Sequence, residues 1–205
     1  MSRLLALAAV ITLAAPALAD DSMVALDDYT PAEVQKVTKA MAKKLDMPIE
    51  DRIELIDRLE SKLKKKAFKR WTRGRPIRGV FAYSLKEGGL VVKWTKGRGK
   101  AAFKGGPSDV DIAMKATSVG AQVGGSKQWG IGLVIGLKRL PAFGGQYKGN
   151  IRQATAISAG HVVTELRRAD LDDEKDHHRV LLLAVATGLS ASTGGTKLKI
   201  TVDWP

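Results

Sequence analysis

One stretch of the chain alternates apolar residues with glycine, and this pattern constrains the fold more than any other feature. Apolar residues occupy every second position from Trp129 to Leu137, and Gly130, Gly132 and Gly136 stand between them. A period of two is that of a β-strand, in which successive side chains point to opposite faces. Glycine inside a strand marks a bulge, a barrel corner or a close approach of another segment. The pattern therefore predicts a strand with one apolar face and one nearly bare face.

Further short apolar segments with strand-like patterns follow one another along the chain, separated by glycine-containing turns. Short strands at even spacing favour an antiparallel sheet. We expect an α+β fold in which N-terminal amphipathic helices pack on a glycine-rich, mostly antiparallel β-sheet that is curled towards a barrel. The segments lie at residues 80–83, 89–94, 110–115, 154–166, 180–191 and 197–202.

Two amphipathic helices are expected before the first strand. Thr30 and Glu33 form a capping box with Pro31 at the first helical position, so a helix should begin there. A second helix should follow Pro48, with acidic residues in its first turns and lysines at its end, as the helix dipole favours. Both apolar faces are expected to pack on the sheet. They are Val34, Val37, Met41 and Leu45 in the first helix and Ile49, Ile53, Ile56, Leu59 and Leu63 in the second.

The first residues have the pattern of a cleaved secretory signal peptide. Arg3 precedes the apolar run Leu4–Leu13, and the small residues Ala17 and Ala19 fit a cleavage site. Asp20 stands where a lipoprotein would carry cysteine, and the chain has no cysteine, so no lipid anchor is expected. Export without disulfides favours the periplasm, and a retained membrane anchor is the alternative. The expected divisions are a signal peptide at 1–19, an acidic lead with two helices at 20–66, and a β domain at 67–205.

The positive charge of the chain is concentrated in one region. Lys and Arg number 34 against 21 Asp and Glu, which gives a net charge of +13. Residues 62–104 hold fifteen of these cations and one acid, Glu87, so the rest of the chain is close to neutral. A regional excess favours an anionic partner, and a solvated face with a flexible linker is the alternative. Aromatic residues are interleaved with the cations, namely Phe68, Trp71, Phe81, Tyr83, Trp94 and Phe103.

Cations interleaved with aromatics suit either nucleic-acid stacking or a membrane interface, where Trp and Tyr lie at headgroup depth. An exported protein meets anionic lipid far more often than nucleic acid, so no nucleic-acid partner is expected. We predict that this block contacts the phosphates of anionic phospholipid, with Trp71 and Trp94 at the interface. The candidate lipid-binding residues are Lys64, Lys65, Lys66, Lys69, Arg70, Trp71, Arg73, Arg75, Arg78, Lys93, Trp94, Lys96, Arg98 and Lys100.

No motif in the sequence indicates catalysis. There is no G-x-S-x-G elbow, and the glycine-rich segments at 96–100 and 130–136 miss the phosphate-loop and dinucleotide patterns. The acids at 170–176 precede His177 and His178 and favour a solvated connection between two strands. We expect no enzyme activity and no cofactor. Two alternatives remain: an envelope scaffold that docks an acidic protein or lipopolysaccharide, and a metal-dependent hydrolase that uses His177 and His178.

Several segments between Gly79 and Ile200 carry a resemblance to one known family. The segment 118–126 is similar to the family's "SVGLQIGAQS", 89–93 resembles "GVLVVR", and 154–160 resembles "ADASVAAGP". The family is that of the SYLF-domain proteins, which bind lipids and include secreted bacterial members. The tryptophan of its "WSAPAF" segment is missing before Ala101. The resemblance implies a glycine-rich β-sheet or barrel with helical flanks that engages anionic lipid without catalysis.

Overall fold

The computed structural model of the protein describes residues 26–64, 72, 74–88, 92–119, 126–154, 160–169, 178–187 and 191–204. Within these ranges the chain forms two α-helices, α1 (Pro31–Lys44) and α2 (Ile49–Leu63), and eight strands. A 3₁₀ helix, η1 (Leu140–Phe143), follows the fourth strand. The strands are β1 (Ile77–Gly88), β2 (Val92–Phe103), β3 (Val110–Val119), β4 (Ser126–Ile135), β5 (Gly145–Ala154), β6 (Gly160–Arg168), β7 (Arg179–Thr187) and β8 (Ala191–Asp203).

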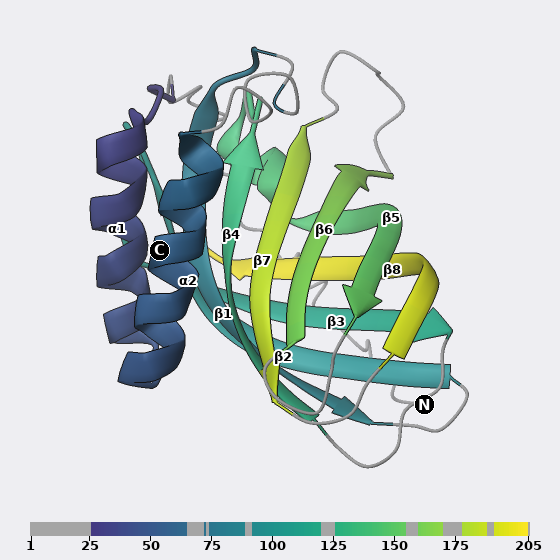
Figure 1. Ribbon diagram of the computed structural model, residues 1–205. Coiled ribbons are helices and arrows are strands. Elements are labelled where there is room, and N and C mark those ends of the chain that lie inside the picture. The colour runs from purple at the N-terminus through teal and green to yellow at the C-terminus, as the bar shows by residue number, and fades with distance from the viewer. Residues whose placement is uncertain are drawn as a thin grey trace, which may run out of the picture.

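The strands close into an antiparallel barrel, and the two helices lie together on one side of it (Figure 1). Around the barrel the order is β1-β2-β3-β8-β5-β6-β7-β4, and β1 completes the circle by pairing with both β2 and β4. α1 contacts β1 and β2, while α2 contacts β7 and β4 and packs against α1. The architecture agrees with the expected α+β class and with an antiparallel sheet curled into a barrel.

The first helix begins where the sequence predicts. The Thr30 side chain accepts a hydrogen bond from the backbone N–H of Glu33 at 3.3 Å, and the Glu33 carboxylate accepts one from the backbone N–H of Thr30 at 2.8 Å. This reciprocal pair satisfies two amide groups that a helix leaves without internal partners.

Among the helices in the described ranges, none is both long enough and apolar enough to cross a bilayer.

The second helix also begins at the predicted residue, but its buried face differs from the expected one. Ile49 and Ile53 are 63% and 57% exposed, whereas Leu55, Ile56 and Leu59 are buried. A residue step turns a helix by about 100°, so the helix contacts the barrel through a face that is rotated from the isoleucine stripe. The expectation that Ile49 and Ile53 pack on the sheet is therefore wrong, and these two side chains remain at the surface.

The sheet separates two hydrophobic clusters. Phe81, Tyr83 and Phe103 belong to the cluster inside the barrel and are almost fully buried. Ile131 and Leu133 belong to the cluster between the outer face of the sheet and the helices. Because side chains alternate across a strand, Phe81, Tyr83 and Phe103 point inward while the exposed cations Lys86, Lys96 and Arg98 point outward. Phe81, Tyr83 and Phe103 are thus packing residues inside the barrel, and they are not part of its outer surface.

The bare face of β4 makes room for aromatic rings inside the barrel. A Cβ atom added at Gly130 would overlap the ring of Tyr83, and one added at Gly132 would overlap the ring of Phe81. The predicted close approach at these glycines is therefore confirmed. The opposite face of the same strand carries Ile131 against the helices, so one strand contributes to both clusters.

One end of the barrel, here called the capped end, is filled by η1 and the residues around it. The ring of Phe143 packs edge-on against Phe103 with centroids 5.1 Å apart. The Tyr147 hydroxyl donates a hydrogen bond to the Phe143 carbonyl at 2.6 Å, and the buried Arg168 guanidinium donates to the Ala142 carbonyl at 2.6 Å. Aromatic packing and buried hydrogen bonds to η1 carbonyls hold this end together.

Candidate anion-binding surface

Four lysines from four neighbouring strands lie side by side on the outer face of the barrel. Lys86 of β1 is opposite Lys96 of β2, Lys96 is opposite Lys115 of β3, and Lys115 is opposite Lys199 of β8. All four are exposed. Neighbouring strands lie about 4.8 Å apart, so directly opposed side chains start close together. We call these four residues the lysine row.

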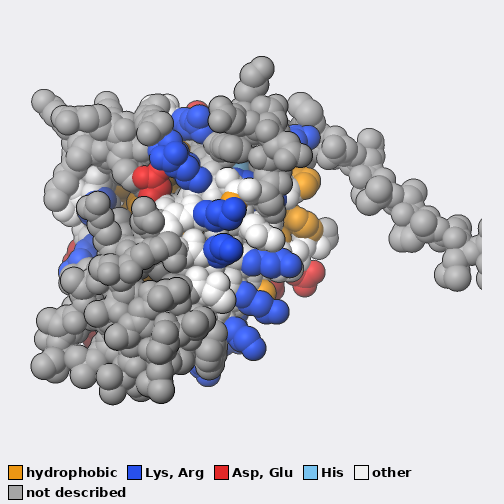
Figure 2. Space-filling view, turned by 90° about the vertical axis from the view of Figure 1, so that its right-hand side faces the viewer, with side chains coloured by type: hydrophobic (Ala, Val, Ile, Leu, Met, Phe, Trp, Pro, Cys, Tyr) orange, Lys and Arg blue, Asp and Glu red, His pale blue; other side chains and the backbone are white. Residues whose placement is uncertain are grey.

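Further cations continue the lysine row on both sides. Lys127 of β4 is opposite Lys86. Beyond β3, Lys197 of β8 is opposite Lys148 of β5, and Lys148 is opposite Arg167 of β6. Figure 2 shows Lys and Arg side chains gathered on the side of the barrel that carries β3, β8 and β5. The cations therefore form a broad basic face on the outside of the barrel.

A shallow hollow of about 220 Å³ lies within this basic face, between β3, β8 and β5. Its walls include Lys115, Lys197 and Lys199, together with the exposed side chains of Thr117 and Gln146. The strand period brings these groups to the outer face, because the residue between the two lysines of β8 points into the barrel core. Three ammonium groups and two neutral polar groups thus surround one depression.

In the part of the chain that the structure describes, no acid neutralises the cations of this hollow. Lys115, Lys197 and Lys199 form no ion pair or hydrogen bond within the described ranges of the chain. Directly opposed like charges destabilise a sheet by about 0.2–1 kcal/mol per pair. The arrangement therefore costs folding stability, and an anionic ligand would remove that cost.

Two lysines elsewhere, one on β2 and one on α1, are neutralised by acids. Lys100 on β2 lies 2.9 Å from Asp111 and 3.2 Å from Asp109, and Lys44 of α1 lies 2.7 Å from Asp109. The hydrogen bond to Asp111 raises the pKa of Lys100, and the hydrogen bond from Lys44 lowers the pKa of Asp109. These contacts tie α1 to the β2–β3 connection, so we assign Lys100 a structural role.

Two further cations hold the segment before α1 against the barrel. The Arg78 Nε lies 3.0 Å from Asp28 Oδ1, and its NH1 donates to the Leu137 carbonyl at 3.0 Å. The Lys104 Nζ lies 2.8 Å from the Glu33 carboxylate. Hydrogen bonds from Lys104 and Thr30 hold the pKa of Glu33 at about 2. Arg78 and Lys104 thus connect α1 and the segment before it to the barrel.

The predicted lipid-binding residues whose side chains the structure describes have different surroundings. Lys96 and Arg98 are exposed on the outer face of β2. Arg78 and Lys100 make the ion pairs described above. Lys64 and Arg75 are exposed, and Lys64 pairs with Glu60. The side chains of Lys93 and Trp94, and the whole of Lys65, Lys66, Lys69, Arg70, Trp71 and Arg73, lie outside the described residues.

Sequence reasoning missed the cations of the basic face that stand in the part of the chain that is neutral on average. Four of them belong to β3, β8 and β5, which follow β2 around the barrel only after it closes in the order β2-β3-β8-β5. The alternation of Lys197 and Lys199 with buried apolar residues was the signal that placed both on one outer face. The four residues are Lys115, Lys148, Lys197 and Lys199.

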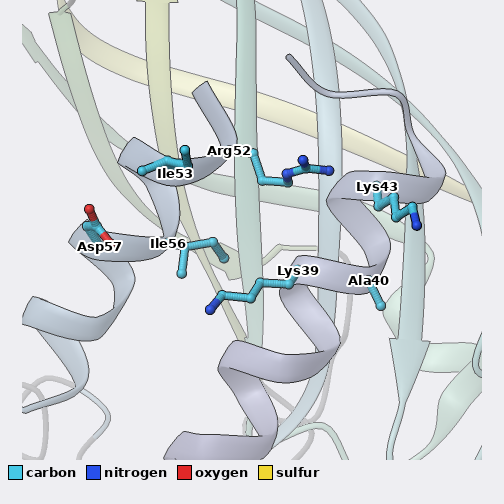
Figure 3. A pocket seen from close by; sticks show the side chains of 7 residues that line it. All are labelled: Lys39, Ala40, Lys43, Arg52, Ile53, Ile56 and Asp57. Atoms are coloured by element: carbon cyan, nitrogen blue, oxygen red, sulfur yellow. The ribbon is translucent and has the colours of Figure 1, made fainter. Parts of the chain in front are cut away.

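A second surface feature is a groove of about 480 Å³ between α1 and α2. The exposed Ile53 lines this groove together with Ile56 of the same helix and Ala40 of α1, and Lys39, Lys43, Arg52 and Asp57 also line it (Figure 3). Figure 3 shows the side chains of Lys39 and Arg52 directed into the space between the two helices. The groove combines an apolar patch with a mainly cationic border, which is a feature of helix-binding sites.

The described residues give a packing role to one of the two histidines of the alternative metal site. His178 is fully buried, and its Nε2 lies 2.7 Å from the Tyr147 hydroxyl. That hydroxyl donates to the Phe143 carbonyl, so the contact requires His178 to donate from Nε2. His177 and the acids at 170–176 lie outside the described residues, and the metal site stays an alternative hypothesis.

Comparison with protein-family models, with curated proteins and with solved structures gave no match to this chain. The resemblance to SYLF-domain proteins therefore stays a prediction. A function has to be inferred from the two surfaces described above, the basic face of the barrel and the groove between the helices.

Proposed function

We propose that the protein binds anionic phospholipid at a membrane surface through the lysine row and the cations beside it, without catalysis. The observation that carries the proposal is the row itself, in which like charges are directly opposed on an exposed face. Within the described chain no acid neutralises Lys115 or Lys199. Each lysine near an anionic membrane contributes about 1 kcal/mol, so the row supplies enough for reversible adsorption.

A membrane suits this surface better than a nucleic acid. The cations spread over β1, β2, β3, β8, β5 and β6, which matches a broad anionic layer. Single-stranded nucleic acid would favour exposed aromatic rings for stacking, but Phe81, Tyr83 and Phe103 are buried. Export by the expected signal peptide would also bring the chain to anionic lipid. These points support the membrane over the polynucleotide.

The proposed contact surface differs from the one predicted from sequence. It retains Lys96 and Arg98, and it adds the cations of β3, β8 and β5. Contact by the segment 64–75 and an interfacial position for Trp71 and Trp94 stay predictions. Periplasmic localisation is part of the proposal and rests on residues 1–19 alone.

Vesicle flotation tests the proposal. We expect the protein to float with vesicles that contain phosphatidylglycerol, to stay behind with neutral phosphatidylcholine, and to dissociate at high salt because exposed charges are screened. The double variant Lys115→Gln/Lys199→Gln should lose most of the binding. The matched control Lys36→Gln/Lys62→Gln removes the same charge from exposed positions on the helices and should bind normally. Equal flotation with neutral and anionic vesicles would contradict the proposal.

A second candidate function follows from the groove between the helices. We propose that it docks an acidic amphipathic helix of a partner protein, which corresponds to the envelope-scaffold alternative. Ile53 would contact the apolar face of that helix, and Lys39, Lys43 and Arg52 would pair with its acids. The exposure of Ile53, at 57%, is the observation that favours this function.

A synthetic acidic amphipathic peptide labelled for fluorescence anisotropy tests the second candidate. Ile53→Ser should weaken peptide binding, while Ile49→Ser serves as a control, because Ile49 is equally exposed but does not line the groove. Both changes are at the surface and should leave folding intact. Binding that Ile53→Ser does not alter, or no binding of the peptide at all, would refute this function.

A further inference from the structure

The hollow within the basic face has the chemistry of a specific anion site. We propose that Lys115, Lys197 and Lys199 form a subsite for a phosphomonoester group, with Thr117 as an additional hydrogen-bond donor. The inference rests on the proposed function and deepens it, because it names a phosphomonoester lipid headgroup as the preferred ligand.

The geometry brings three ammonium groups to one place. Lys199 is directly opposite Lys115 across the β3–β8 pair, and Lys197 is directly opposite Thr117 in the same pair. The Cα atoms of residues two positions apart on a strand are separated by about 7 Å, and those of residues directly opposite on neighbouring strands by about 5 Å. The four positions therefore form a compact rectangle, and all four side chains line the hollow. Lysine side chains are long and rotatable, so their three ammonium groups can converge on one anion.

The number of donors matches a phosphomonoester better than a phosphodiester. A phosphomonoester carries a charge of about −1.5 to −2 at neutral pH and presents three unesterified oxygens. A phosphodiester carries one negative charge and presents two such oxygens. Three cations around one hollow therefore gain more from the monoester, since the attraction grows with the ligand charge. The Thr117 hydroxyl provides a neutral donor on the same rim.

The hollow differs in this respect from the rest of the basic face. Lys86, Lys96 and Lys148 are exposed cations on the outer face of the barrel, but they do not line the hollow. A face that worked by diffuse attraction alone would follow surface charge and ignore the kind of phosphate. A subsite would instead discriminate between two lipids that give a membrane the same surface charge.

The experiment compares two kinds of vesicle made in phosphatidylcholine. One kind carries phosphatidic acid, a phosphomonoester, and the other carries phosphatidylglycerol, a phosphodiester, in amounts that give the same zeta potential. We expect the full chain to bind phosphatidic acid about three- to fivefold more tightly, which is the range of one exposed charged contact. The preference should increase from about pH 5 to about pH 8, because the second proton of a phosphomonoester leaves near pH 6 while the lysines stay charged.

Variants locate the preference within the face. Lys197→Gln and Thr117→Val should abolish the preference for phosphatidic acid. Lys148→Gln removes the same charge as Lys197→Gln from the position opposite it on β5, and it should weaken binding to both lipids while keeping the preference. Equal loss of preference in Lys148→Gln and Lys197→Gln would overturn the subsite.

The outcomes separate the inference from the proposed function. Equal binding to both lipids, with the lysine row still required, would overturn phosphatidic acid as the preferred ligand and leave membrane binding standing. No binding to either vesicle would overturn membrane binding. An NMR titration with glycerol 3-phosphate then decides the source of the ligand: shifts confined to the backbone amides of 115–117 and 197–199, without vesicle preference, would support the subsite but assign it to a soluble phosphomonoester. No shifts and no preference would refute it.

Discussion

Lys96 and Lys100 stand four residues apart on the outer face of β2, and they face different residues on the neighbouring strands. Lys100 lies within 3.2 Å of Asp109 and Asp111, which raise its pKa. Lys96 lies between Lys86 on one neighbouring strand and Lys115 on the other. One strand therefore carries a cation that the fold neutralises and a cation that the fold places among other cations. A count of charge along the chain treats the two as equal, and the tertiary structure does not.

The same contrast extends over two regions of the molecule. Around the start of α1 and the β2–β3 connection, cations are paired with acids and join separate segments, as Lys44 does with Asp109 and Lys104 with Glu33. Around the hollow, Lys115 and Lys199 are opposed and have no such partner in the described chain. The ion pairs of the first region therefore stabilise the fold, and the opposed lysines of the second destabilise it. Changes in the two regions should shift stability and vesicle binding in different directions.

The largest effect should come from the capped end. Phe143→Ala removes a fully buried ring that packs on Phe103, and such a change lowers the free energy of unfolding by about 3–5 kcal/mol. Urea denaturation measures this loss. The fraction that remains folded should still bind phosphatidylglycerol vesicles, because Phe143 packs inside the barrel while the lysine row is exposed on its outer face. Loss of vesicle binding by the folded variant would show that the two regions are coupled.

Single charge removals should have effects of opposite sign in the two regions. Lys100→Gln breaks contacts to two aspartates and should lower the free energy of unfolding by less than about 1 kcal/mol, because the pairs are exposed. Lys115→Gln relieves repulsion from two opposed lysines and should raise it by up to about 1 kcal/mol. Vesicle binding should respond in reverse, weakening in Lys115→Gln. Destabilisation by both changes would contradict the comparison.

Salt should reduce the difference between these two variants. At about 1 M ionic strength the Debye length is about 3 Å, so both the attraction at Lys100 and the repulsion at Lys115 are screened. Repeating the urea denaturation of Lys100→Gln and Lys115→Gln across salt concentrations should bring their stabilities towards the same value. A difference that is independent of salt would point to side-chain packing in place of charge as its cause.

The elements with local signals could be predicted, and those that depend on remote pairing could not. The capping box at Thr30 and Glu33 determines the start of α1, and Gly130 and Gly132 indicated the close approach of other segments to β4. In contrast, β5 was not expected as a strand, because its residues 145–154 alternate weakly. The position of β8 between β3 and β5 depends on closure of the whole barrel.

The candidate site was predicted only in part for the same reason. Lys96 and Arg98 are in the basic block of the sequence, but Lys115 and Lys199 come from strands far along the chain. Their proximity follows from strand register, which no local pattern encodes. Tyr83 shows the reverse case: it is close to the cations in sequence, but its side chain lies on the inner face of the sheet. Charge along the chain therefore indicated the cations of β2 but not the cations that the closed barrel places beside them.

The smallest effect concerns pH and the Glu33 contact near the capped end. Lys104 and Thr30 hold the pKa of Glu33 at about 2, below the value of about 4.5 for a free carboxyl group. A carboxyl group with a lowered pKa contributes stability above its unfolded pKa and loses it as the pH falls towards the folded value. Glu33→Gln should therefore be less stable than the unchanged protein at neutral pH, and the difference should shrink as the pH falls from about 4.5 to about 2. Because the side chain is exposed, salt should also reduce the difference.

Urea denaturation at several pH values measures the stability difference, with Glu50→Gln in the first turn of α2 as the control. If the stability difference of Glu33→Gln were the same at every pH, the Glu33 side chain would contribute through its packing and not through its charge. Ion pairs would then not be the reason that the region around the start of α1 differs from the lysine row.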